Sequence, residues 1–280
     1  LFLRIDRVER YLMTGRPVST FRNTNDFATF MLFSVFIAYV CLANSKSMKG
    51  KCFYVTIMFS SGALVFRTLS RANILGLLVA ILVFVGLSMK KSRRKYGLIF
   101  GLSTLSLVVL AMLDAVLLFL NERIYFDFVS NRGSDYVRTN LIKNGILFLE
   151  KTFGFGTGAG NIEYWMENRS VHYVSRVLMM HNWWVEILVA YGALIFVLYV
   201  IFYVNLWLSM YRTYRDSSCS KDRSISIGIM CCMAGYVIGS VSASSNISVE
   251  WLWSFWGLCI VYQGITSTTK RVNVLSRAQL

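Results

Sequence analysis

The sequence TFGFGTGAGNIEYWMENRSVHYVSRVLMMHNWWVEILVAYG occupies positions 152–192 and is the stretch around which the chain is organised. It contains both histidines of the protein, four glycines that alternate with other residues, and the start of a long apolar run. Most of the sequence before and after the surrounding polar segment has the length and apolar character of membrane-spanning helices. Chemistry in water is therefore expected here.

The composition indicates a membrane protein. Of the 280 residues, 56% are hydrophobic and only 15% are charged, whereas soluble domains have about 45–50% apolar and about 25% charged residues. A single proline leaves long helices uninterrupted. The sequence therefore predicts an all-α integral membrane protein.

The apolar runs predict about seven transmembrane helices, since a span needs about 20 mostly apolar residues. The predicted organisation is an outer segment at 1–26, four helices within 27–120, a large extracytoplasmic loop at 121–182, three helices within 183–266 and a cytoplasmic tail at 267–280. The individual spans are expected at 27–43, 52–69, 72–89, 96–120, 183–210, 225–241 and 249–265.

The formal net charge of +15 is explained by topology. Basic residues gather in the short loops 44–51, 90–95 and 211–224 and in the tail, and such short basic loops face the cytoplasm. The 121–182 loop is then outside the cell. Because no basic stripe lies outside this membrane pattern, the expected partner is the lipid bilayer and no nucleic acid.

The sequence predicts neither a metal site nor a cofactor. The six cysteines lack CxxC spacing, and His172 and His181 lack a recognised zinc-ligand spacing. His172 is assigned no role.

Three arginines are candidate anion ligands. Arg71 lies in a tight turn between two predicted spans, and Arg132 and Arg138 lie in the outer-loop sequence SNRGSDYVRTN. A guanidinium matches phosphate geometry. The alternative is that these arginines are solvated loop residues that carry no ligand.

His181 is the candidate general base, because a lone imidazole at the outer membrane surface can have a pKa near the operating pH. The alternative is an interfacial histidine in the aromatic belt of Trp183 and Trp184. Asn182 can cap the helix that follows, and Glu186 favours the positive end of that helix. Glu186 could instead orient the histidine or bind a sugar hydroxyl.

The alternating glycines match neither a dinucleotide-binding fingerprint nor a P-loop. They allow two interpretations: an irregular loop that requires positive φ, or backbone amides that approach a phosphate. The glycines concerned are Gly154, Gly156, Gly158 and Gly160.

These features occur in an order that resembles the family of O-antigen ligases and Wzy-type polysaccharide polymerases. The resemblance rests on SRAN at 70–73, the loop arginines, the glycine stretch and MHNWW at 180–184 followed by Glu186 and Gly192. The sequence TFRNTNDFA at 20–28 is similar to a segment that precedes a span in that family, and GNIEYWMEN and MHNWWVEILVAYG are most similar to capsule or teichuronic acid polymerases of Gram-positive bacteria. The resemblance covers about residues 14–210.

The resemblance implies a GT-C-like, metal-independent glycosyltransferase. Such an enzyme transfers a glycan from an undecaprenyl-pyrophosphate-linked donor to an acceptor saccharide. By this resemblance His181 activates the acceptor hydroxyl, while Arg71 and either Arg132 or Arg138 hold the pyrophosphate. Supporting roles fall to Asn182, Glu186, Gly156 and Gly158.

The resemblance further implies a role in capsule biosynthesis, at an active site on the extracytoplasmic face of the bacterial plasma membrane. Because family members have more spans, N-terminal helices are expected to be missing here and the fragment to be inactive. The alternatives are a flippase or transporter of lipid-linked oligosaccharides and a non-catalytic scaffold. A transporter predicts charges deep within several spans, whereas the apolar runs here are nearly charge-free except at their outer ends.

Overall fold

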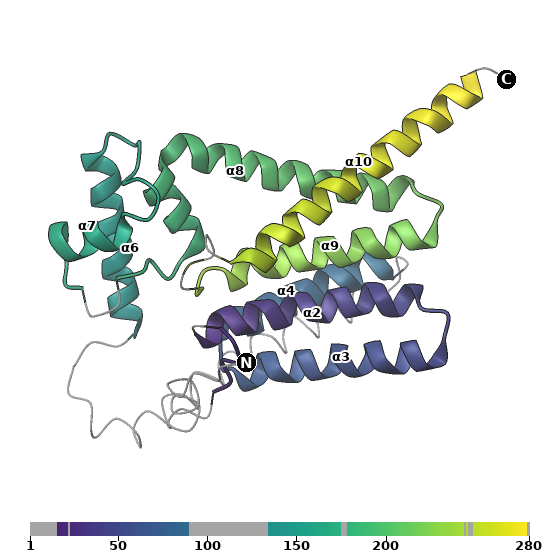
Figure 1. The fold of residues 1–280 in the computed structure, drawn as a ribbon, viewed down its shortest axis with the longest axis horizontal. Helices are drawn as coiled ribbons and strands as arrows, with labels where there is room; N and C mark the ends of the chain where they lie inside the picture. Colours follow the sequence, from purple (N-terminus) through teal and green to yellow (C-terminus); the bar gives the residue numbers. More distant parts are fainter. Residues whose placement is uncertain are drawn as a thin grey trace.

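The computed structural model describes residues 16–21, 23–89, 134–174, 178–243, 245 and 249–278. All regular structure in these residues is helical, which confirms the predicted all-α class (Figure 1). The helices are α2 (Thr24–Asn44), α3 (Met48–Arg67), α4 (Arg71–Ser88), α6 (Ser134–Lys151), α7 (Ile162–Arg169), α8 (Trp183–Asp216), α9 (Ser220–Gly239) and α10 (Glu250–Ala278).

A helix stands at every predicted span that falls on described residues. Within this described part, α2, α4 and α8 are long and apolar enough to cross a membrane, whereas α3, α9 and α10 do not meet the same criterion. The predicted span at 96–120 lies outside the described residues. The count of about seven spans therefore stays a prediction.

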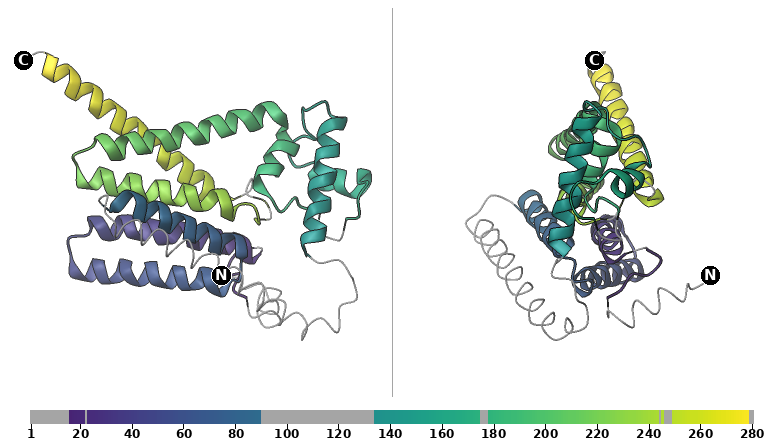
Figure 2. Two further views of the ribbon diagram at one scale, coloured as in Figure 1. Left: turned by 180° about the vertical axis from the view of Figure 1, so that it is seen from behind. Right: turned by 90° about the vertical axis from the view of Figure 1, so that its left-hand side faces the viewer.

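The bundle consists of α2, α3, α4, α9 and the longer part of α8, which run alongside one another, while α10 crosses α8 obliquely (Figures 1 and 2). The most extensive contact joins α4 to α9. A Cβ atom added to Gly76 of α4 would lie 2.5 Å from the carbonyl oxygen of Gly235 on α9. Glycine thus lets these two backbones touch, as small residues do in membrane bundles.

Polar contacts between side chains, one buried and one partly buried, align the helices at the two ends of the bundle. At one end, Thr29 of α2 donates its hydroxyl to the side-chain oxygen of Asn73 on α4, at 3.0 Å. At the other end, the Asn44 amide donates to the Ser224 hydroxyl of α9, also at 3.0 Å. The starts of α2 and α4 therefore share one end, where α9 finishes.

A smaller unit lies beyond that end of the bundle (Figure 1). It consists of α6, α7 and the first turns of α8, and it has a hydrophobic core separate from that of the bundle. The buried residues of this second core are Leu141, Phe148, Ile162, Met166, Met180, Val189 and Ala190.

Helix α8 bends sharply at Gly192, whose φ of 85° and ψ of 172° are not helical. Its first turns run across the end of the bundle, and the remainder runs alongside α9 (Figure 1). In an unbroken helix the amide of Ala193 would donate to the carbonyl of Val189. Here Ala193 donates to the carbonyl of Gly154, at 2.9 Å, and Val189 accepts from the amide of Thr157, at 2.8 Å. Residues 153–160, the glycine loop, thus satisfy backbone groups released by the bend.

The contact between the glycine loop and the bend of α8 requires a glycine on each of the two segments. Gly156 and Gly192 have positive φ, and a Cβ added to Gly156 would lie 2.6 Å from the amide nitrogen of Gly192. The amide of Gly158 donates to the carbonyl of Ala190 at 2.9 Å. The structure therefore supports the interpretation as an irregular loop, because the amides of Thr157 and Gly158 are already bonded within the protein.

We expect Gly156→Ala to destabilise the protein by at least about 1–3 kcal/mol, the usual cost of forcing a side chain into an unfavourable backbone region. The overlap with Gly192 adds to this cost. Thermal unfolding of the detergent-solubilised protein measures the effect. Gly62→Ala is the matched control, because a Cβ there meets nothing within 4 Å. An equal melting temperature for both variants would contradict the docking of the glycine loop.

Candidate functional site

The start of α8 is fixed by its N-cap. The side-chain oxygen of Asn182 accepts hydrogen bonds from the amides of Trp184, at 3.1 Å, and Val185, at 3.3 Å. This confirms the predicted capping role of Asn182. The cap sets the direction of the residue before it, which is His181.

His181 has an unusual backbone and an unusual side-chain environment. Its φ of 49° lies in the left-handed region, which few non-glycine residues adopt. The side chain is half-buried, and its Nδ1 atom is buried with no hydrogen-bond partner among the described residues. A buried polar atom without a partner is uncommon and is found at functional sites. The described residues therefore leave the hydrogen-bonding capacity of Nδ1 unused.

Arg138 lies close enough to His181 to change its ionisation. Burial, and secondly the positive charge of Arg138, lower the pKa of His181 from 6.5 to about 4. The imidazole is therefore neutral at physiological pH. This pKa is lower than the near-neutral value expected from the sequence.

Of the two arginines that the outer-loop sequence offered, Arg138 is described and lies on the second turn of α6. Arg132 lies outside the described residues. The structure thus brings Arg138 to the histidine.

Glu186 is buried in the first turn of α8 and accepts a hydrogen bond from the hydroxyl of Ser245, at 2.6 Å. Ser245 belongs to the connection between α9 and α10. The contact therefore joins this connection to the helix that begins beside His181. Ser245 could not be predicted from the sequence, because it stands in a serine-rich stretch in which no spacing distinguishes one serine from another.

The two tryptophans after Asn182 attach α8 to the end of α9. The amide of Trp183 donates to the carbonyl of Ser240, at 3.0 Å, and the indole of Trp184 donates to that of Val237, at 3.1 Å. Trp183 is only 1% exposed. The alternative that places Trp183 in an aromatic belt at the membrane surface does not fit this residue, because its ring is packed inside the bundle core.

Arg71 is the first residue of α4, and it is exposed at the same end of the bundle. Two residues later, Asn73 is fully buried and donates to the carbonyl of Asn25 and the hydroxyl of Ser70. A Cβ added to Gly239 would lie 2.5 Å from the side-chain oxygen of Asn73. The start of α4 is thus fixed against the end of α9, to which α8 is also attached.

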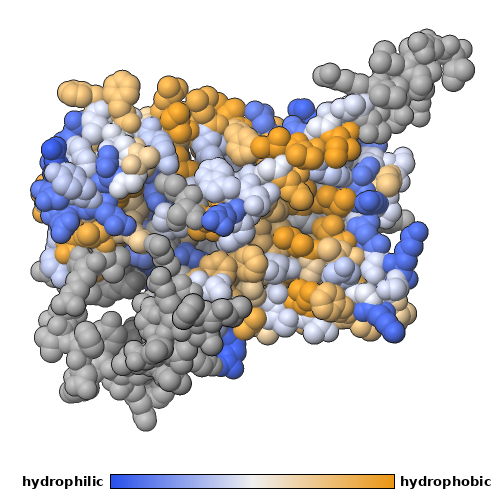
Figure 3. All heavy atoms as spheres, in the orientation of Figure 1, coloured by the Kyte–Doolittle hydropathy of each residue, from blue (hydrophilic) through white to orange (hydrophobic). Residues whose placement is uncertain are grey.

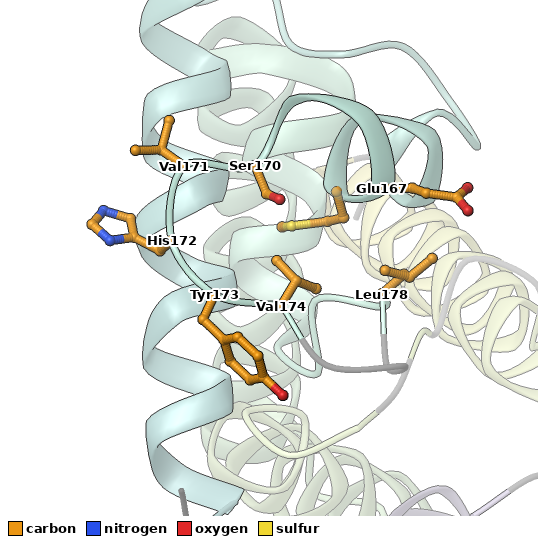
Figure 4. Close-up of a pocket in the computed structure, with 8 residues that line it drawn as sticks. Glu167, Ser170, Val171, His172, Tyr173, Val174 and Leu178 are labelled. Atoms are coloured by element: carbon orange, nitrogen blue, oxygen red, sulfur yellow. The ribbon is translucent and has the colours of Figure 1, made fainter.

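An open cavity of about 570 Å³ lies between α7 and the segment that leads to His181 (Figure 4). Its lining includes Glu167, Ser170, Tyr173 and Leu178. Its volume is within the range of about 300–1,000 Å³ that is usual for small-molecule sites. Figure 4 shows the ring of His172 pointing away from the other labelled side chains.

The wall of this cavity is held by two buried asparagines of α6. The side-chain oxygen of Asn144 accepts from the amides of Val171 and His172, and its nitrogen donates to the carbonyl of His172 at 3.0 Å. Asn140 donates to the carbonyl of Tyr173 at 3.2 Å. Neither asparagine was among the predicted site residues, although their spacing of four places them on one helix face.

The chain is similar in sequence to known proteins. Residues 56–200 match the family model described as O-antigen ligase. The teichuronic acid biosynthesis protein TuaE of Bacillus subtilis (strain 168) is 29% identical over 268 residues, which cover 94% of this chain and 53% of that protein. The chain thus spans about half the length of this curated relative. No solved structure matches the chain.

The family match runs from the interior of α3 to the part of α8 beyond its bend. It includes Arg71, Arg138, the glycine loop and His181. Since the matched residues make up more than half of the 280, the chain belongs to the O-antigen ligase family.

Proposed function

We propose that this chain carries the catalytic site of a membrane glycosyltransferase that joins a glycan from an undecaprenyl-pyrophosphate-linked donor to an acceptor saccharide. The observation that carries the proposal is the neutral His181, whose buried Nδ1 is bonded to no described residue, beside the charge of Arg138. Membership of the O-antigen ligase family supports the same reaction class. The name of the relative favours a polymer of the cell envelope, such as a capsule polysaccharide, as the product.

In the proposed reaction, Nδ1 of His181 accepts the proton of an acceptor hydroxyl, which requires the ring proton to be on Nε2. The acceptor oxygen forms a bond to the anomeric carbon of the donor while the bond from that carbon to the pyrophosphate breaks. Arg138 and Arg71 stabilise the negative charge that develops on the leaving pyrophosphate. These fixed guanidiniums provide stabilisation that a metal ion gives in other transferases.

The low pKa of His181 belongs to the protein without substrate. An imidazole with a pKa of about 4 is neutral but is a weak base. A bound pyrophosphate would offset the positive charge of Arg138 and so raise the pKa of His181. The donor thereby makes the histidine a stronger base only in the complex that is to react.

The distribution of buried charge favours this surface chemistry over transport. Among the described residues, the buried acidic side chains are Asp26 and Glu186. Both lie in the first turns of their helices, at the end of the bundle near His181. A transporter of charged lipid-linked sugars would be expected to have charges deeper within its spans.

His181→Ala in the full-length protein is expected to lower glycan transfer by about 10²–10⁴-fold, the usual contribution of a general base. The assay measures transfer from an undecaprenyl-pyrophosphate-linked glycan in membranes with equal protein levels. His172→Ala, the matched histidine control, should retain full transfer. Normal transfer by His181→Ala would eliminate His181 as the base.

The pH dependence separates the roles of the two neighbouring groups. Because His181 acts when neutral, kcat/KM should be constant near neutral pH and fall as the pH drops toward about 4. Arg138→Gln removes a charge that lowers the pKa of His181, so the fall should begin at higher pH, and transfer should be weaker at every pH.

Arg169→Gln is the matched arginine control, since Arg169 lies over the Trp165 ring on α7. It should leave the profile unchanged. An Arg138→Gln profile that coincides with that of the Arg169 control would show that Arg138 does not act on His181.

The proposed extracytoplasmic position of the site can be tested with cysteines. Ser170 borders the cavity, and Cys219 is exposed in the connection between α8 and α9, at the opposite end of the bundle. A membrane-impermeant maleimide should label Ser170→Cys in intact cells and should label Cys219 only after the membrane is opened. The reverse order of labelling would invert the topology.

A further inference from the structure

Two aromatic side chains of the glycine loop are almost completely exposed. Phe153 is 90% exposed and Phe155 is 84% exposed. They flank Gly154, so both belong to the loop that docks against the bend of α8. Neither the proposed reaction nor the hydrophobic core of α6 and α7 uses these two rings.

Their exposure is imposed by the backbone. The amide of Gly154 donates to the carbonyl of Leu149, at 2.9 Å, and the amide of Phe155 donates to the carbonyl of Thr152, at 3.0 Å. Phe153 has a φ of 52°, an unfavourable value for a bulky side chain. With Gly154 also bonded to Ala193 of α8, the loop is held in a shape that turns both rings outward.

The part of α8 that follows the bend, next to the glycine loop, has an exposed apolar surface. Leu194 is 72% exposed and is followed on one helix face by further exposed apolar residues, namely Val197, Leu198, Ile201, Val204 and Leu208. Hydrophobic atoms gather along α8 in Figure 3. This face belongs to a helix that is long and apolar enough to cross a membrane. The Phe155 carbonyl would lie 2.6 Å from a Cβ on Gly192, so the loop stands where this face begins.

The basic residue next to the glycine loop is also suited to a membrane surface. Lys151 ends α6, is exposed, and stands two residues before Phe153. A lysine stem can lie along apolar surface while its ammonium group reaches lipid phosphates. Aromatic residues together with lysine are typical of the boundary between lipid headgroups and acyl chains.

We propose that Phe153 and Phe155 insert into the headgroup and acyl-chain boundary of the outer leaflet and anchor the unit of α6 and α7 to the bilayer. The anchor is continuous with the exposed face of α8 and is attached to it by backbone hydrogen bonds. It fixes the height of His181 above the membrane. Only this last consequence rests on the proposed function, since a lipid-linked donor would present its pyrophosphate at that height.

Fluorescence quenching of the full-length protein in phosphatidylcholine and phosphatidylglycerol vesicles tests the anchor. Phe155→Trp and Phe153→Trp each add one indole, and its signal is obtained by subtracting the wild-type emission. Lipids brominated near the top of the acyl chain should quench the added indole strongly, and aqueous acrylamide should quench it weakly. Tyr164→Trp on α7, an exposed position in the same unit, is the control and should show the opposite pattern.

Quenching of Phe155→Trp and Phe153→Trp by acrylamide as strong as that of Tyr164→Trp would overturn the proposal, because the loop would then face water. Protection from both quenchers would also overturn it, because another protein surface would cover the rings. Neither result depends on transferase activity. A failed anchor can thus be distinguished from a failed catalytic assignment.

Discussion

The bend of α8 at Gly192, held by the glycine loop, is the constraint on which the rest of the site depends. An unbroken helix rises about 1.5 Å per residue, so the nine residues before the bend would carry Asn182 about 14 Å beyond the bundle. The bend instead lays these turns across the end of the bundle, where the amide of Trp183 reaches the carbonyl of Ser240. One helix thereby provides both an apolar span and the support for His181.

The charged groups around His181, at the start of α8, act in the same direction. The capped N-terminus of α8 presents partial positive charge, and Arg138 adds a full charge beside His181. Together with burial they disfavour protonation of the imidazole, and they favour any anion that enters. Glu186, whose Oε1 atom accepts a hydrogen bond from Ser245, stands in the first turn of the same helix, where a carboxylate is favoured by the helix dipole.

Features that depend on local pattern could be predicted from the sequence, and features that depend on packing could not. The apolar runs located the helices, and the alternating glycines indicated a loop with positive φ. The position of Arg138 beside His181 could not be predicted, because it requires knowing which face of α6 meets α8. In the structure Gly145 packs against Val189 of α8. Arg138 lies two helical turns earlier on the same face of α6. The burial of Trp183 could not be predicted for the same reason, since sequence alone does not distinguish a lipid face from a protein face.

The same packing explains why the glycine loop and the histidine segment belong to one unit. Helix α6 is attached to α8 at two places. Just after α6 ends, the carbonyl of Gly154 accepts a hydrogen bond from the amide of Ala193, and within α6 Gly145 packs against Met180, which precedes α8, and Val189 of α8. Two attachments fix both the position and the direction of a rigid helix. Arg138, farther along that helix, is therefore positioned by glycines whose contacts in the structure are with α8. A substitution in the glycine loop would move a charge at the site through the helix that carries it.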